Sequence, residues 1–157
     1  MVPLSVGESH RVGGLTVTAT PARHSGRREP FGPTAEALGF LVEGGGRRVY
    51  FAGDTDLFPE MRGLGAPLDL ALLPVWGWGP RLGPGHLDPM RAAEAVARLR
   101  PRVAIPMHWG SLGVIGHWQR QARRRAPARV FAAEVRRRGL PTYVRVLAPG
   151  TGLTLVD

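Results

Sequence analysis

The stretch Tyr50-Phe51-Ala52-Gly53-Asp54-Thr55 decides the fold, because apolar strand residues give way in it to a glycine and a carboxylate. Two other stretches share this design: Thr20-Pro21-Ala22-Arg23-His24-Ser25 and Ile105-Pro106-Met107-His108-Trp109-Gly110. Strand ends in an α/β sheet carry their side chains to one edge, so we expect His24, Asp54 and His108 to converge there. Zinc, iron and manganese accept such imidazole and carboxylate ligands.

Each of these residues also has an ordinary structural role open to it. A lone histidine at the end of a strand is commonly a hydrogen-bonded structural residue. Asp54 could be a turn or N-cap residue for the segment that begins at Leu57. Spacing alone therefore leaves both the metal-site and the structural interpretation open.

Strands are expected both before and after the stretch from Tyr50 to Thr55. Alternating residues predict three strands in the first third of the chain, and the last two form a hairpin around a glycine turn. These strands cover residues 15–19, 39–43 and 48–51, and the turn is Gly44-Gly45-Gly46. Continuous apolar runs at 70–74 and 103–106 predict two further strands, buried on both faces.

Helices are expected in the second half of the chain. Asp88 as N-cap and Pro89 at the first helical position predict a helix that reaches Leu99, between the two buried strands. A second helix is expected over 118–138, interrupted at Pro127 and stopped at Gly139. Two short strands, at 142–147 and 153–156, would close the chain. The pattern predicts an α/β protein, with an antiparallel portion first and strand-helix-strand units later.

Five motifs together resemble the later motif series of the metallo-β-lactamase fold superfamily. They are Thr20 to Arg27 (TPARHSGR), Tyr50 to Thr55 (YFAGDT), Leu70 to Pro74 (LALLP), Pro84 to Pro89 (PGHLDP) and Ile105 to Gly110 (IPMHWG). The residues of these motifs are similar to those of the branch that contains ascorbate-6-phosphate lactonase-like proteins and N-acylphosphatidylethanolamine-hydrolysing phospholipase D. The resemblance extends from about Leu15 to the final strand and implies an αββα sandwich with two metals at the edge of its sheets.

The resemblance also implies roles for four residues. His24 would be the third histidine of the first metal, Asp54 the carboxylate that bridges both metals, and His108 a ligand of the second. The metals, zinc or else manganese or iron, would share a hydroxide as the nucleophile. His86 would lie beside them and hydrogen-bond or protonate the substrate, so Asp54 and His86 are the candidate catalytic residues. Alternatively, His86 is a plain loop residue before the helix.

The family's leading motif, H-x-H-x-D-H, does not occur before His24, where His10 is the only histidine. Residues 1–157 are therefore expected to form a single domain that corresponds to the C-terminal half of the sandwich, with the N-terminal half absent. We expect partial or no metal occupancy and an impaired hydrolase. Its substrate would be a small-molecule or phospholipid-like ester, a lactone or a phosphodiester.

Two other functions stay open. The first is a non-catalytic half-domain that binds a partner polypeptide, either a complementing chain or, in a homo-oligomer, a second copy. The second is an arginine-rich nucleic-acid binder, suggested by the net charge of +9. No aromatic residues are interleaved with Arg123-Arg124-Arg125 or Arg136-Arg137-Arg138 to stack bases, so no specific nucleic acid is expected.

Composition narrows the chemistry further. The chain has no cysteine, which excludes disulfides and thiolate zinc sites. No apolar run is long enough to suggest a transmembrane segment, and the start lacks a signal-peptide pattern, so we expect a cytoplasmic protein. Trp76 and Trp78 follow a buried strand and could line an apolar cleft or pack over the sheet edge, whereas Trp109 is expected to pack and orient His108.

Overall fold

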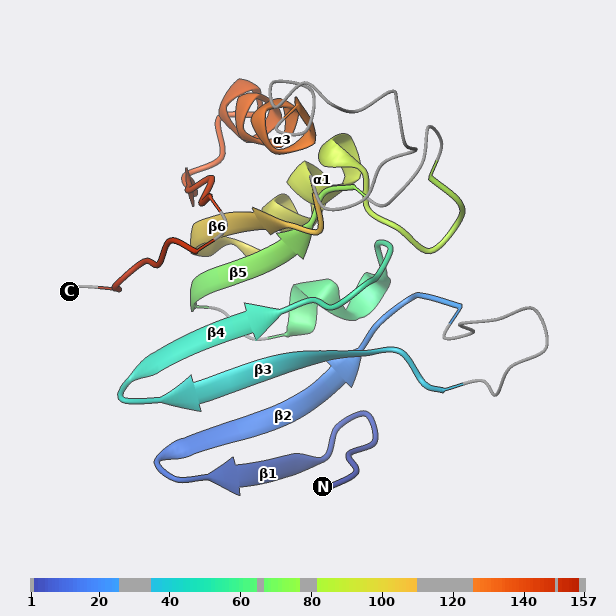
Figure 1. Ribbon diagram of the computed structural model, residues 1–157, viewed down its shortest axis with the longest axis vertical. Coiled ribbons are helices and arrows are strands. Elements are labelled where there is room, and N and C mark those ends of the chain that lie inside the picture. Colours follow the sequence, from blue (N-terminus) through green and yellow to red (C-terminus); the bar gives the residue numbers. More distant parts are fainter. Residues whose placement is uncertain are drawn as a thin grey trace.

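A computed structural model describes residues 2–25, 35–64, 67–76, 82–109, 126–148 and 150–155. Seven strands of this part form one sheet in which each strand lies beside its neighbours in the sequence (Figure 1). They are β1 (Ser9–Val12), β2 (Leu15–Pro21), β3 (Leu38–Gly44), β4 (Arg47–Phe51), β5 (Leu68–Pro74), β6 (Pro101–Met107) and β7 (Tyr143–Val144). β1 to β4 pair antiparallel, and β4 to β7 pair parallel. The predicted α/β class is confirmed.

The hairpin between β3 and β4 follows the predicted design. Its turn is formed by Gly45 and Gly46, whose φ angles are 56° and 72°. A two-residue turn with both central residues at positive φ matches the right-handed twist of the flanking strands, and glycine adopts it without steric cost. Gly44, predicted to lie in the turn, is instead the last residue of β3.

Helix α1 (Pro89–Leu99) lies between β5 and β6 in the sequence, as predicted. The Asp88 carboxylate accepts a hydrogen bond of 2.8 Å from the Arg91 backbone N–H and caps the first turn. The helix ends at Arg100, which adopts the left-handed conformation with φ 50° and donates its N–H to the Val96 carbonyl. The sequence signals at both ends of α1 therefore act locally as expected.

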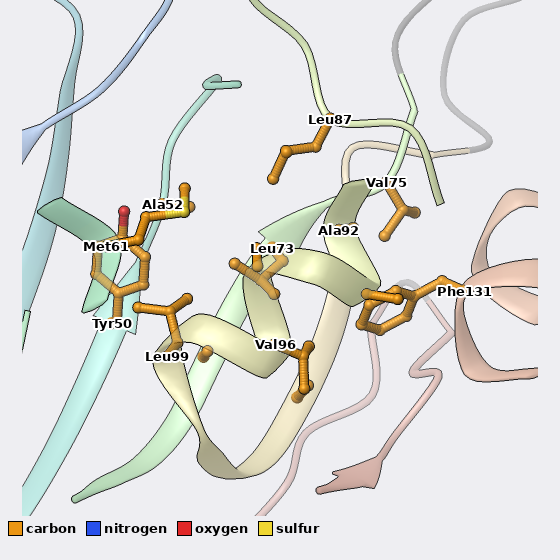
Figure 2. Close-up of a cluster of buried hydrophobic side chains, with 14 of the residues drawn as sticks. Tyr50, Ala52, Met61, Leu73, Val75, Leu87, Ala92, Val96, Leu99 and Phe131 are labelled. Atoms are coloured by element: carbon orange, nitrogen blue, oxygen red, sulfur yellow. The ribbon is translucent and has the colours of Figure 1, made fainter. Parts of the chain in front are cut away.

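The core lies between the sheet and the helices. One face of the sheet presents Leu41, Tyr50, Ala71 and Ala104, which the strand registers place in a row. Side chains from α1, from the 3-10 helix η1 (Pro59–Gly63) and from α3 (Ala126–Arg137) cover this face (Figure 2). The Phe131 ring of α3 is fully buried there. Burial of this apolar surface is the main stabilising contribution to the fold.

The opposite face of the sheet is apolar and partly open. Its central row, set by the strand registers, consists of Val17, Val42, Val49, Leu70 and Val103, all half-buried. The large apolar residues of the strands that are exposed belong to this same face, because successive residues alternate between faces: Val12, Leu15, Phe51 and Tyr143. None of the described helices lies on it (Figure 1). The described residues thus form one sheet layer and one helical layer, half of an αββα sandwich.

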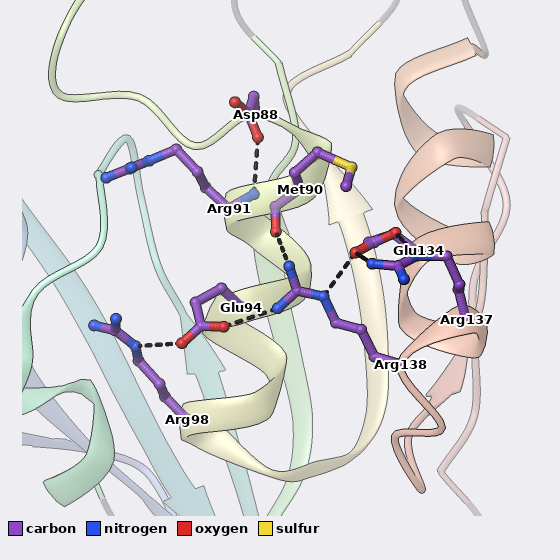
Figure 3. A network of polar contacts seen from close by, with 8 residues as sticks. All are labelled: Asp88, Met90, Arg91, Glu94, Arg98, Glu134, Arg137 and Arg138. Atoms are coloured by element: carbon purple, nitrogen blue, oxygen red, sulfur yellow. Dashed lines mark hydrogen bonds and ion pairs between the residues drawn. The ribbon is translucent and has the colours of Figure 1, made fainter.

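An ion-pair network joins α1 to α3 (Figure 3). Arg138 reaches Glu94 of α1 at 2.8 Å and Glu134 of α3 at 2.8 Å. Hydrogen bonds from Arg137 and Arg138 lower the pKa of Glu134 to about 2. Two arginines of the cluster 136–138 therefore have a structural role, whereas 123–125 lie outside the described residues.

Predictions for the C-terminal third were partly wrong. Pro127 does not interrupt a helix but lies in the first turn of α3, where a missing N–H costs nothing; residues 118–125 lie outside the described part. The strand predicted over 142–147 is only the two residues of β7, and the described residues 153–155 form none. β1 was not predicted. No helix in the described ranges is long and apolar enough to cross a membrane.

Candidate functional site

The three candidate ligands follow strands that end at the same edge of the sheet. His24 comes after β2, Asp54 after β4 and His108 after β6. β2 and β4 are both antiparallel to β3, and β6 runs parallel to β4 through β5, so all these strands end on one side (Figure 1). The structure brings the four candidate residues together as two pairs.

The first pair consists of His108 and Asp54. His108 Nε2 lies 3.5 Å from Asp54 Oδ1, and the two side chains are about one third and two fifths exposed, at 34% and 43%. His108 Nδ1 lies 2.6 Å from the Trp76 carbonyl oxygen, which can only accept a hydrogen bond. Nδ1 therefore carries the proton, and in the neutral ring the lone pair of Nε2 faces the carboxylate.

The backbone of His108 is held in an uncommon conformation. Its φ of 57° is in the left-handed region, which is costly for a residue other than glycine. Trp109, the next residue, donates from its indole Nε1 to the Pro106 carbonyl at 2.8 Å and packs against the core, as expected for a packing residue. Such local strain persists where surrounding contacts fix it, and it is common at functional sites.

The second pair consists of His24 and His86. Their Nε2 atoms lie 3.3 Å apart, and the rings meet edge to face with centroids at 4.8 Å. His86 Nδ1 lies 3.3 Å from the Gly83 carbonyl oxygen, so Nδ1 donates and the neutral His86 offers the lone pair of Nε2 to His24. Gly85 permits this approach: its φ is 86°, and a Cβ there would lie 3.4 Å from the His24 Cα.

Polar contacts, most of them partly buried, fix the segments that carry His24 and Asp54. The Arg23 N–H donates to Thr55 Oγ1 at 2.7 Å, and the Asp56 N–H donates to the Arg23 carbonyl at 2.9 Å. Arg91 of α1 forms an ion pair with Asp56 at 2.6 Å. Sequence reasoning missed Thr55 and Asp56, although two polar residues directly after a candidate ligand were a usable signal.

Gly53 lets the chain turn directly before Asp54. Its φ is 63°, and a Cβ at this position would lie only 2.5 Å from the Leu38 carbonyl oxygen. The alternative role of Asp54 as an N-cap is not observed, because η1 begins after Phe58 without any side-chain cap. Asp54 instead points to His108.

The donor chemistry of the site suits a divalent metal, but the donor count is incomplete. A histidine whose Nδ1 is fixed by a carbonyl and whose Nε2 is open beside a carboxylate has the usual arrangement of a metal ligand. Among the described residues, however, no group of three or more histidine and acidic side chains could hold an ion. Since zinc takes four ligands, each pair supplies only part of a coordination shell. Trp78, a candidate lining residue, lies outside the described part.

Comparisons with known proteins agree with this fold. A UPF0173 metal-dependent hydrolase of Deinococcus radiodurans is 40% identical over 150 residues, which are 95% of this chain and 59% of the relative. A metal-dependent hydrolase of Symbiobacterium thermophilum is 41% identical over 131 residues, 80% of this chain and 51% of the relative. The solved structure of Igni18, a metallo hydrolase from Ignicoccus hospitalis, superposes with a TM-score of 0.75 at 29% identity, covering 99% of this chain and 61% of that one.

The chain therefore spans between half and about three fifths of the proteins it matches. A family model described as a beta-lactamase superfamily domain matches residues 1–109, which include β1 to β6 and all four candidate site residues. This family match agrees with the motif series of the sequence and with the position of His24, Asp54 and His108 after strands that end at one edge of the sheet. On these grounds the chain belongs to the metallo-β-lactamase fold superfamily.

Proposed function

We propose that this chain supplies part of the metal centre of a metal-dependent hydrolase that cleaves an ester, a lactone or a phosphodiester. The observation that carries the proposal is the pair of Asp54 and His108. The Trp76 carbonyl fixes the proton of the imidazole on Nδ1, so that the lone pair of Nε2 faces the Asp54 carboxylate. The metal-dependent hydrolases that the chain resembles support the same reaction class. A divalent metal, zinc or else manganese or iron, supplies a Lewis acid when it is bound.

The chain's own residues have distinct parts in this proposal. Asp54 and His108 would hold the metal through a carboxylate oxygen and Nε2, and His24 would hold it through an imidazole nitrogen. His86 lies against His24, with its Nδ1–H held by the Gly83 carbonyl; it would orient the substrate from that position, or protonate it from Nε2 when the ring is an imidazolium. Thr55, Asp56 and Arg91 hold the two ligand-bearing segments in register.

The remaining ligands come from the region of such hydrolases that has no counterpart in this chain. The chain matches only 59% of the Deinococcus relative. The half-open apolar sheet face supports this part of the proposal. An apolar sheet face is normally covered by a second layer of structure, and one row of apolar side chains on this face spans β2 to β6. We expect the isolated chain to have little or no hydrolase activity.

The test is complementation. The chain is mixed with the part of the Deinococcus relative that it does not match, and hydrolysis of p-nitrophenyl esters and bis-p-nitrophenyl phosphate is followed with added zinc or manganese. Metal-dependent turnover that Asp54→Asn abolishes and Glu60→Gln preserves would support the proposal. Glu60→Gln is a suitable control because it makes the same change at an exposed acidic residue of η1, on the helical side of the sheet.

A second candidate function, a non-catalytic half-domain that binds a partner polypeptide, is favoured by the same open face. The complementation experiment separates the two. Tight association without metal uptake or turnover would identify the non-catalytic half-domain, and robust turnover by the isolated chain would contradict both.

A further inference from the structure

A cavity of about 420 Å³ opens between the N-terminal ends of α1 and α3. Apart from the Asp88 carboxylate, its described lining is apolar: Trp76, Pro89, Met90, Ala126, Pro127 and Val130. Asp88 is already engaged, because it caps α1 through the Arg91 N–H. The volume of the cavity lies within the range of about 300–1,000 Å³ that is usual for small-ligand sites, which are mostly apolar.

Two side chains in this cavity are unusually exposed for their type. Met90 is 44% exposed and Val130 is 47% exposed, although each follows or precedes a buried residue of its helix, Pro89 and Phe131. Figure 3 shows Met90 extending from α1 toward α3, above the ion pairs that join the two helices. Met is flexible and polarisable, so it adapts to apolar ligands of varied shape.

The cavity adjoins the candidate site at two points. Trp76 lines it, and the carbonyl of the same residue accepts the hydrogen bond from His108 Nδ1. Asp88 lines it as well and comes two residues after His86. A ligand that reaches from the histidines into the cavity would thus leave a polar edge and enter an apolar space.

We propose that this cavity binds an uncharged, apolar group of the substrate, an aliphatic chain or an aryl ring next to the bond that is cleaved. The assignment to the substrate rests on the proposed function. Because most of the described lining is apolar, a charged group placed in the cavity would lose its hydration without a full set of polar partners. The cavity therefore selects substrates by the size of their apolar portion.

The experiment measures binding of two neutral probes, octan-1-ol and butan-1-ol, to the purified chain by isothermal titration calorimetry. Each methylene buried in the cavity tightens binding by up to about 4-fold, so octan-1-ol should bind far more tightly than butan-1-ol. Val130→Lys, which adds a charge at the cavity, should weaken octan-1-ol binding at least about 10-fold. Val12→Lys makes the same change at a valine that is 58% exposed on β1 and should leave binding unchanged.

A second readout locates the probe relative to the site. Octan-1-ol should shift the NMR signals of the His108 ring and leave those of His10 unmoved. Absence of octan-1-ol binding, or equal weakening by both lysine substitutions, would overturn the inference. If the alcohol binds as expected but complementation gives no turnover, the proposed function fails and the cavity stands as a binding site; turnover without alcohol binding removes the cavity alone.

Discussion

Replacing Gly53 by alanine tests whether the backbone before Asp54 is fixed as the structure describes. Gly139 provides the matched control, because its φ is 65° against 63° at Gly53 and a Cβ there meets nothing within 4 Å. Both substitutions carry the cost of a left-handed residue other than glycine, about 1–2 kcal/mol. Only Gly53→Ala also places a Cβ at 2.5 Å from the Leu38 carbonyl oxygen, which belongs to the backbone of β3 and moves only if the strand does.

The extra cost of that contact should be about 1–3 kcal/mol, the range for forced overpacking. We therefore expect Gly53→Ala to lower the free energy of unfolding by about 2–5 kcal/mol and Gly139→Ala by about 1–2 kcal/mol. Urea denaturation followed by circular dichroism measures both, provided that the slope with urea stays constant. Equal losses in the two variants would refute the close contact at Gly53.

Three further predictions concern the core, the ion-pair network and the Asp54 pair. Phe131→Ala should lower the free energy of unfolding by about 3–5 kcal/mol, since the ring is fully buried, and the exposed Arg129→Ala should change it by less than about 0.5 kcal/mol; urea denaturation decides. The pKa of Glu134 is lowered to about 2, so its stabilising contribution should be complete above the ordinary glutamate pKa and disappear as the pH falls toward 2; Glu134→Gln should remove this part of the pH dependence of unfolding. Asp54→Asn should leave unfolding in metal-free buffer within about 0.5 kcal/mol of the original, because the side chain is 43% exposed, and a larger loss would mark Asp54 as a structural residue.

Much of the fold was predictable because its signals are local. The glycine turn of the β3–β4 hairpin, the Asp88 cap and the apolar runs of β5 and β6 each act within a few residues, and the hairpin, the cap and the two strands were confirmed. The predicted burial of β5 and β6 on both faces was wrong, because Leu70 and Val103 are only half-buried on the open face. β1 was missed because its four residues are all exposed and owe their conformation to pairing with β2. Pro127 was misinterpreted because a proline in the first turn of a helix and one inside it look alike without the helix start.

For the candidate site too, one part was predictable from the sequence and another was not. Strand-end position and motif resemblance were sufficient to name His24, Asp54, His86 and His108, and their role as ligands and catalytic groups stays a prediction. The arrangement in two pairs could not be predicted, because the partner that orients His108 is a backbone carbonyl of Trp76, 32 residues away. A backbone acceptor carries no residue-type signal.

Zinc content most directly tests the claim that this chain supplies only part of a metal centre. The chain alone, and the chain mixed with the unmatched part of the Deinococcus relative, are passed through gel filtration in buffer with zinc, and bound zinc is measured by elemental analysis. We predict well below one zinc per isolated chain, at least one per chain in the complex, and loss of that zinc with Asp54→Asn but not with Glu60→Gln. One tightly held zinc per isolated chain, unaffected by Asp54→Asn, would contradict the account.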